Sequence, residues 1–149
     1  MNYKVKKLGK EDIQHFINLI RLFEDVFEMQ NFSMLDQEHL SELLSQEKFL
    51  VFVALLDDEV IGGTTAYCMI HYYSKREIVF LYDLAVAEEM QRKGVGAQLI
   101  NALKDHCKQS GAEVIFLEAE ETDPHAVEFY RSTGAAEAKG YFFSYDLND

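Results

Sequence analysis

The feature that most constrains this chain is a change in hydrophobic spacing around residues 91–96. Residues 77–86 form an apolar run with the length of a buried strand, and apolar residues then recur as on one face of a helix. That helical face consists of Val95, Leu99, Ala102, Leu103 and His106. Gly111 is placed to end the helix, and residues 114–117 have the composition of a short strand. This order of elements predicts a right-handed parallel crossover.

Upstream of this unit the sequence predicts a short first strand, two helices and a hairpin. The first helix begins at Asp12, and its apolar face consists of Ile13, Phe16, Ile20, Phe23 and Phe27. Asp36 is placed to cap a shorter second helix. Residues 49–56 are continuously apolar, and the acidic residues 57–59 separate them from the β-forming residues 60–70. These two runs predict a hairpin with an acidic turn.

Downstream, Asp123 and Pro124 have the residue types of a helix start, and this last helix is expected to end near Gly134. A final strand is predicted from Phe142, Phe143 and Tyr145. The chain shows no repeat, low-complexity segment or linker. We therefore expect one α/β domain over residues 1–149, with a mixed central sheet flanked by helices.

Charge and composition narrow the classes of function. The 149 residues include 14 basic and 26 acidic side chains, a net charge of −12. This balance argues against nucleic acid as a partner and favours a cationic small molecule, although acidity for solubility alone explains it equally well. No apolar run is long enough to span a bilayer, and the N-terminus lacks the apolar stretch of a signal peptide. We expect a cytoplasmic protein, with Cys68 and Cys107 as small buried or half-buried apolar residues.

Residues 91–96 have the features of an anion site at the start of a helix. They are Gln91, Arg92, Lys93, Gly94, Val95 and Gly96. The two glycines permit close backbone approach, and the first turn of a helix has N–H groups without internal partners. With Arg92 and Lys93 beside them, a diphosphate is the natural ligand. A lone Gly-x-Gly is also often only a turn, and this segment is neither a Walker loop nor a dinucleotide fingerprint.

Two further motifs flank this loop. They are Tyr82-Asp83-Leu84-Ala85-Val86 before it and Ala126-Val127-Glu128-Phe129-Tyr130-Arg131-Ser132-x-Gly134 after it. Together with Gln91-x-x-Gly94-x-Gly96 they resemble the GNAT superfamily of acetyltransferases, over about residues 77–135. The first motif and the acidic residues 118–124 resemble the aminoglycoside 3-N-acetyltransferases of type I. This resemblance implies a GNAT-like fold, acetyl-CoA as co-substrate and antibiotic resistance as the biological role.

The resemblance also implies where acetyl-CoA binds. Backbone groups of Leu84, Ala85 and Val86 would pair with the pantetheine amides, as a strand pairs with a peptide-like ligand. The N–H groups of residues 91–97, from Gln91 to Ala97, would hold the pyrophosphate. A backbone N–H near Leu84 would polarise the acetyl carbonyl and stabilise the oxyanion.

Acyl transfer from a thioester to an amine requires removal of a proton from the amine and a donor at the departing thiolate. By resemblance Tyr130 is the candidate donor, and simple packing is its alternative. Asp83 interrupts an apolar strand and is the candidate for binding and deprotonating the amine, with a satisfied structural carboxylate as the alternative. Glu120 and Glu121, expected to end the neighbouring strand, would hold further ammonium groups or are solvated loop residues. Whether Asp83 or Glu120 acts as the base stays open.

Other polar residues receive structural interpretations. Asp123 is expected to cap its helix rather than contact the cofactor, and His106 and His125 are expected on helix surfaces. His71 lies in a loop that could border the acceptor. The His and acidic residues show no metal-ligand spacing, so we expect no metal.

Three functions follow as hypotheses. The first is acetylation of an aminoglycoside amine, at the 3-N position by resemblance. The second is acetylation of another amine, such as a polyamine, an amino acid or a protein N-terminus. The third is a non-catalytic acyl-CoA-binding module, against which the presence of both Asp83 and Tyr130 argues. A homodimer is expected only by analogy with the superfamily, and no membrane or nucleic-acid partner is expected.

Overall fold

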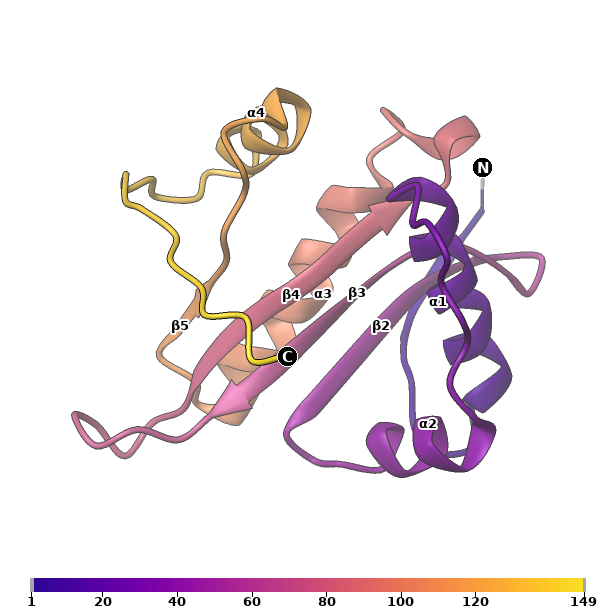
Figure 1. Cartoon of the computed structure of the whole chain (residues 1–149), viewed down its shortest axis with the longest axis horizontal. Helices are drawn as coiled ribbons and strands as arrows, with labels where there is room; N and C mark the ends of the chain where they lie inside the picture. The colour runs from indigo at the N-terminus through magenta and orange to yellow at the C-terminus, as the bar shows by residue number, and fades with distance from the viewer. Residues whose placement is uncertain (1, 149) are drawn as a thin grey trace. The chain divides into compact units, whose positions relative to one another are not determined.

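The computed structural model describes residues 2–148, which divide after Leu117 into two compact units. The first unit contains β1 (Lys4–Lys7), α1 (Ile13–Val26), α2 (Gln37–Leu44), β2 (Phe49–Leu56), β3 (Glu59–Met69), β4 (Ile78–Val86), the short 3-10 helix η1 (Glu88–Met90), α3 (Val95–Ser110) and β5 (Val114–Phe116). The second unit contains α4 (Pro124–Ser132). Figure 1 shows these elements.

The first unit is built on one mixed sheet, as predicted. Its strand order is β1-β2-β3-β4-β5, with antiparallel pairing up to β4 and parallel pairing of β4 with β5. The helix α3 connects the two parallel strands. The predicted hairpin is also confirmed: Asp57 and Asp58 form its two-residue turn with φ values of 50° and 66°. Two positive φ values in succession are what a type I′ hairpin turn requires.

The strand β2 contributes to two cores because helices cover both faces of the sheet. Leu50 and Phe52 belong to the cluster that contains α3, whereas Val51 and Val53 belong to the cluster that contains α1 and α2. Figure 1 shows α3 behind the sheet and α1 in front of it. A strand buried on both faces reads as a continuous apolar run, which explains why residues 49–56 do not alternate.

The helix α1 packs close to the sheet on a face slightly rotated from the predicted one. Its fully buried residues are Phe16, Leu19 and Phe23, while Phe27 is 41% exposed. Gly63 on β3 permits this contact, since a Cβ there would lie 2.4 Å from Cδ1 of Leu19. The absence of a side chain at Gly63 therefore leaves room for Leu19 to be buried. The spacing of apolar residues within the helix could not show this contact.

The structure of the second unit differs from the prediction in one element. The expected final strand at Phe142, Phe143 and Tyr145 is wrong, because the described residues 135–148 contain neither helix nor strand. The large apolar side chains of this segment are 77% to 92% exposed. They are Tyr141, Phe142, Phe143, Tyr145 and Leu147. High β-propensity records how well a residue fits a sheet surface, and it forms no strand without a hydrogen-bonded neighbour.

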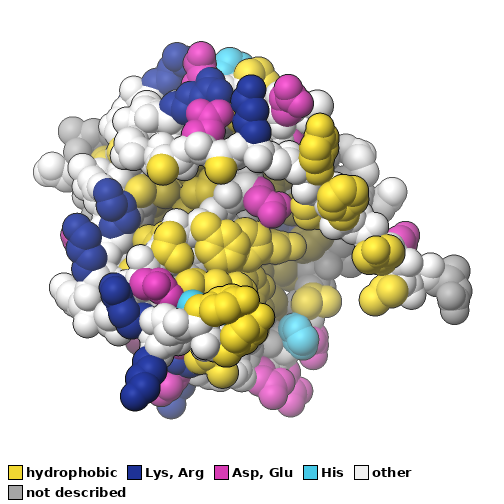
Figure 2. Space-filling view, turned by 90° about the vertical axis from the view of Figure 1, so that its left-hand side faces the viewer, with side chains coloured by type: hydrophobic (Ala, Val, Ile, Leu, Met, Phe, Trp, Pro, Cys, Tyr) yellow, Lys and Arg dark blue, Asp and Glu magenta, His cyan; other side chains and the backbone are white. Residues whose placement is uncertain are grey.

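Exposed large apolar side chains also occur in the first unit, where Tyr72 and Tyr73 of the β3–β4 loop are 87% and 83% exposed. Figure 2 shows that hydrophobic side chains reach the surface of the molecule.

Candidate active site

The strand β4 loses one of its two neighbours halfway along its length. Its parallel pairing with β5 covers only Ile78–Phe80, opposite Val114–Phe116, whereas its antiparallel pairing with β3 continues to Val86. From residue 81 to residue 86, no strand of the described chain pairs with the second edge of β4. Unpaired backbone groups on a strand edge are suited to bind an extended amide-containing ligand.

The ladder determines which backbone groups face that open edge. The N–H of Ala87 donates to the carbonyl of Ile61 at 2.8 Å, so Ala87 faces β3. Because backbone groups of successive residues alternate between the two edges, Ala85 also faces β3, and Leu84 and Val86 face the open edge. The carbonyl of Val86 there accepts a hydrogen bond from Nε2 of Gln91 at 2.9 Å. Leu84 and the N–H of Val86 are therefore the groups that can pair with a ligand.

A β-bulge lies directly beside this open segment. Thr65 pairs with Asp83, but the next residue, Ala66, pairs with Leu81, so Tyr82 is the extra residue of β4. Bulges bend a strand and redirect its side chains, and they are frequent next to active sites. On the β3 side, the buried Thr64 donates its hydroxyl to the carbonyl of Asp83 at 2.8 Å.

The carboxylate of Asp83 has the properties of a base. Asp83 is half-buried in β4, and burial raises its pKa above the ordinary value for aspartate. The salt bridges found in the described part of the chain do not include Asp83. A desolvated carboxylate without a cationic partner binds a proton more readily than an exposed one, which suits removal of a proton from an ammonium group.

Two tyrosine side chains lie near Asp83. The rings of Tyr67 on β3 and Tyr82 on β4 meet edge to face, with centroids 5.6 Å apart and planes at 89°. The pKa of Tyr67 is raised mainly by burial, and further by the charges of Tyr82 and Asp83. Tyr82 is 59% exposed, so this pair presents an aromatic surface beside the carboxylate.

The predicted anion loop does not follow β4 directly. The short helix η1 lies between the strand and the loop, and α3 begins only at Val95. Arg92 and Gly94 have φ values of 61° and 85°, a left-handed backbone that turns the chain into the helix. No side chain caps the start of α3, and a Cβ on Gly94 would meet no atom within 4 Å. The first-turn N–H groups therefore have no side-chain partner, and with the exposed Arg92 and Lys93 they suit the diphosphate of a CoA ligand.

The second unit contains the other predicted residues. Tyr130 is half-buried on α4, and its ring centroid is 5.1 Å from that of Phe129. Capping by Asp123 is confirmed, because its carboxylate accepts a hydrogen bond from the N–H of Ala126 at 3.1 Å. Glu120 and Glu121 do not end a strand, since β5 stops at Phe116, and they lie exposed in the turn before α4. The proposed roles of Tyr130, Glu120 and Glu121 stay predictions.

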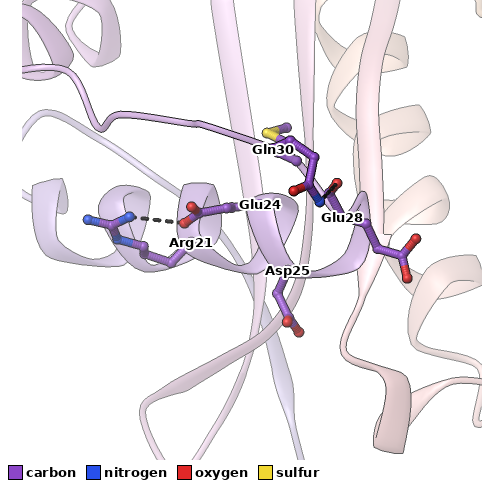
Figure 3. A pocket seen from close by; sticks show the side chains of 6 residues that line it. Arg21, Glu24, Asp25, Glu28 and Gln30 are labelled. Carbon is purple, nitrogen blue, oxygen red and sulfur yellow. Dashed lines mark hydrogen bonds and ion pairs between the residues drawn. The ribbon is translucent and has the colours of Figure 1, made fainter.

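A surface hollow of about 670 Å³ lies at the C-terminal end of α1. It is lined by Arg21, Glu24, Asp25, Glu28, Met29 and Gln30. Figure 3 shows the ion pair between Arg21 and Glu24. Its two atoms lie 2.9 Å apart, Asp25 follows on α1, and Glu28 lies in the turn after the helix ends at Val26. None of the residues predicted from sequence lines this hollow, so it is a separate acidic feature.

His71 and His106 of the first unit have structural contacts. Nε2 of His71 lies 2.7 Å from Oε1 of Glu113 and 2.9 Å from the carbonyl of Arg76, which ties the β3–β4 loop to the start of β5. His106 is half-buried rather than on the helix surface, and it packs edge-on against Phe52. Burial lowers the pKa of His106 and raises that of Cys107 to about 11, so Cys107 is a buried thiol as expected.

Within residues 2–148, no group of three or more His, Cys, Asp and Glu side chains is arranged to hold a metal ion. No helix in the same range is long and apolar enough to cross a membrane.

Sequence reasoning missed Thr64 and Tyr67 as members of the site. Both were visible only as β-forming residues of one strand, and their role depends on the register between β3 and β4. A one-residue change of register would turn both side chains to other neighbours. The one available signal was the polar Thr64-Thr65 pair in a strand that is otherwise largely buried.

Comparison with known proteins agrees with this geometry. The model of the acetyltransferase (GNAT) family matches residues 13–135. An uncharacterized N-acetyltransferase, YhfO of Bacillus subtilis (strain 168), is 32% identical over 109 residues, covering 73% of this chain and 72% of YhfO.

Two solved structures extend the comparison. An aminoglycoside acetyltransferase from an uncultured soil metagenomic sample, meta-AAC0020, is similar in its complexes with trehalose and with sisomicin. The identities are 46% and 45% and the TM-scores 0.97 and 0.96, each covering 98% of this chain and 97% of the other. The aminoglycoside N-acetyltransferase AAC(6')-Iy, solved in complex with CoA, shares only 17% identity and therefore the fold alone. Its TM-score is 0.80, with coverage of 99% and 96%.

Proposed function

The chain belongs to the acetyltransferase (GNAT) family, and we propose that it transfers the acetyl group of acetyl-CoA to an amine of an aminoglycoside. Acetyl transfer with acetyl-CoA as the donor follows from the family. The finer step, an aminoglycoside acceptor modified at its 3-N position, is ours. The family match includes residues of both units, so we treat residues 1–149 as one acetyltransferase domain.

The observation that carries the aminoglycoside proposal is the similarity to meta-AAC0020, an aminoglycoside acetyltransferase solved with sisomicin. At 45% identity over nearly the whole of both chains, the likeness extends well beyond the shared fold. The charge balance supports the same acceptor class. An aminoglycoside is a polycation, and a protein with a net charge of −12 attracts it electrostatically. The 3-N position rests on the sequence motifs at residues 82–86 and 118–124 alone.

The geometry of β4 supports binding of acetyl-CoA along the open edge, with one set of groups at the pantetheine arm and another at the diphosphate. The carbonyl of Leu84 and the N–H of Val86 are available to pair with the amides of the pantetheine arm. The N–H groups at the start of α3, with Arg92 and Lys93, bind the diphosphate. The donor is thereby held along the strand that carries Asp83.

Asp83 then binds the acceptor ammonium and removes its proton, directly or through water. Its half-buried position and its raised pKa bring it nearer to the acidity that a general base needs near neutral pH. The N–H of Leu84, one residue away, is the donor for the oxyanion that forms on the acetyl carbonyl. Base and oxyanion donor thus follow each other along one strand.

The second unit supplies the remaining proposed roles. Tyr130 on α4 protonates the departing thiolate of CoA, as the family motif at residues 126–134 implies. Glu120 and Glu121, both exposed and close to the start of α4, bind other ammonium groups of the polycationic acceptor. Since Glu120 is a solvated carboxylate, we assign the base to Asp83 and electrostatic attraction to Glu120.

An acceptor screen tests this proposal. The protein is incubated with acetyl-CoA and a panel of aminoglycosides that includes gentamicin and sisomicin, and release of free thiol is followed. We expect release well above the rate without acceptor, and NMR of the product then identifies the acetylated nitrogen. No release with any aminoglycoside, together with release with a polyamine, an amino acid or a peptide N-terminus, would transfer the assignment to that acceptor. No release with any amine would favour a non-catalytic acyl-CoA-binding module.

A further inference from the structure

Thr64 is a fully buried polar residue with one specific hydrogen bond. Its side chain on β3 is 0% exposed, and Oγ1 donates to the carbonyl of Asp83 at 2.8 Å. Buried hydroxyl groups need a partner, and many find it in the backbone of their own strand or helix. Here the partner belongs to the next strand, and it is the carbonyl of the proposed base.

This hydrogen bond lies at the edge of the β-bulge. Thr64 pairs with Leu84 and Thr65 with Asp83, and the register then shifts so that Ala66 pairs with Leu81. The hydroxyl of Thr64 therefore holds the first carbonyl after the extra residue Tyr82 and keeps it directed at β3. A bulge bends its strand and disrupts the ladder locally, so a side-chain hydrogen bond beside it restrains the strand where the ladder is weakened.

The orientation of that carbonyl determines the direction of the next N–H. In a trans peptide the C=O and the following N–H point in opposite directions. Since the carbonyl of Asp83 points toward β3, the N–H of Leu84 points away from β3, toward the open edge. The alternation counted from the Ala87 to Ile61 hydrogen bond gives the same direction independently.

We propose that Thr64 is a positioning residue for acetyl transfer, resting on the function proposed above. By holding the Asp83 carbonyl, it directs the Leu84 N–H at the acetyl carbonyl and fixes the strand from which the Asp83 carboxylate reaches the amine. Its hydroxyl also polarises the peptide group that it binds, which strengthens the N–H on the other side as a donor. Thr64 itself touches neither substrate.

The kinetic test compares two substitutions at this residue. Thr64→Val keeps the shape and removes the hydroxyl, and Thr64→Ser keeps the hydroxyl. For Thr64→Val we expect kcat to fall by about 10- to 100-fold while the KM values for acetyl-CoA and amine change by less than about threefold, since the lost interaction acts on the oxyanion. Thr64→Ser should stay within about threefold of the wild type, because the positioning bond remains. Thr64→Ala replaces Thr64→Val if the latter does not fold.

Val79→Ala is the matched control for loss of stability alone. Val79 is 1% exposed on β4, at a position where β4 pairs with both neighbours. This substitution should lower Tm and leave kcat unchanged at temperatures where the variant is folded. If Thr64→Val retains the kcat of the wild type, or if Thr64→Ser loses as much as Thr64→Val, the positioning role is overturned.

A second readout does not depend on the acceptor. The ¹⁵N–¹H NMR signal of the Leu84 amide is followed while acetyl-CoA is added. We expect a clear shift in the wild type and in Thr64→Ser, and a shift at least halved in Thr64→Val. If the wild type acetylates no aminoglycoside but this pattern holds, the proposed acceptor fails and the role of Thr64 stands. An equal shift in all three proteins would overturn the role of Thr64 whatever the acceptor.

Discussion

The two halves of β4 have different neighbouring strands and different types of residue. Over Ile78–Phe80 the strand pairs with β3 on one side and β5 on the other, and over residues 81–86 it pairs with β3 alone. The paired half has a buried Val79 and a Phe80 ring that stacks on Phe116 at 5.0 Å. The open half contains the bulge at Tyr82, the carboxylate of Asp83 and the available N–H of Leu84. Figure 1 labels β4 and β5, which pair only over the first residues of β4.

This difference shows how one strand can serve stability and chemistry in separate stretches. Where both edges are paired, backbone groups are satisfied and side chains contribute by packing. Where one edge is open, backbone groups are available to a ligand, and a charged side chain is tolerated at the cost of a raised pKa. Substitutions in the two halves should therefore produce different kinds of defect.

The largest effect is expected from Asp83→Asn in the open half. Loss of a general base lowers kcat/KM by about 10²- to 10⁴-fold, or roughly 3 to 5 kcal/mol in the barrier. Affinity for acetyl-CoA should not change, since the amide has the shape of the carboxyl group. Steady-state kinetics and a CoA titration measure both quantities. Full turnover by Asp83→Asn would place the base elsewhere, with Glu120→Gln as the next variant to test.

A smaller effect, of the opposite kind, is expected from Val79→Ala in the paired half. Removal of two buried methyl groups, with the small cavity that remains, lowers the free energy of unfolding by about 2 kcal/mol. Urea denaturation measures this loss, and kcat of the folded variant should equal that of the wild type. A selective loss of kcat here would mean that the two halves are coupled.

The pH dependence of kcat/KM follows from the raised pKa of Asp83 in the open half of β4. The base works in its ionised form, so kcat/KM should fall about tenfold per pH unit below that pKa, and this limb should lie above the ordinary aspartate range. A profile that is flat down to the ordinary aspartate pKa would contradict the assignment.

The stability of the protein should change with pH in the direction opposite to its activity. Burial disfavours the charged form in the folded state, so the stability that Asp83 contributes is present below its unfolded pKa and is lost as the pH rises through the folded pKa. Asp83→Asn, which cannot ionise, should escape this loss. The difference in unfolding free energy between Asp83→Asn and the wild type should therefore grow across that window and then level off, as measured by urea denaturation at several pH values.

The smallest effect is expected from Gln91→Ala, which removes the donor to the Val86 carbonyl at the end of the open half. One neutral hydrogen bond contributes about 1 kcal/mol, so we expect the KM for acetyl-CoA to rise about fivefold while kcat is retained. Gln109→Ala is a suitable control, because Gln109 is exposed near the opposite end of α3. An unchanged KM would show that the loop is positioned without this contact.

Much of the fold was predictable from local patterns. Residues 49–56 matched β2 at both ends, and Gly111 ended α3 with a φ of 84° as a C-terminal glycine should. These features depend on neighbours within a few residues, which the sequence displays directly. The aromatic residues 141–145 show the limit of this approach, because a strand needs a partner that local pattern cannot supply.

The candidate site likewise combines residues that local sequence signals point to with features that only the fold determines. Residue types and spacing singled out Asp83 and the loop at 91–96 as candidates, because an isolated carboxylate in an apolar strand and glycines before a helix are local signals, whereas Leu84 came from the family resemblance. Only the tertiary structure decided that β4 is open beyond Phe80, that Leu84 and Val86 face this edge, and that Thr64 holds the carbonyl of Asp83. Those facts depend on the register between strands distant in sequence, since a shift of one residue reverses the direction of every side chain and backbone group.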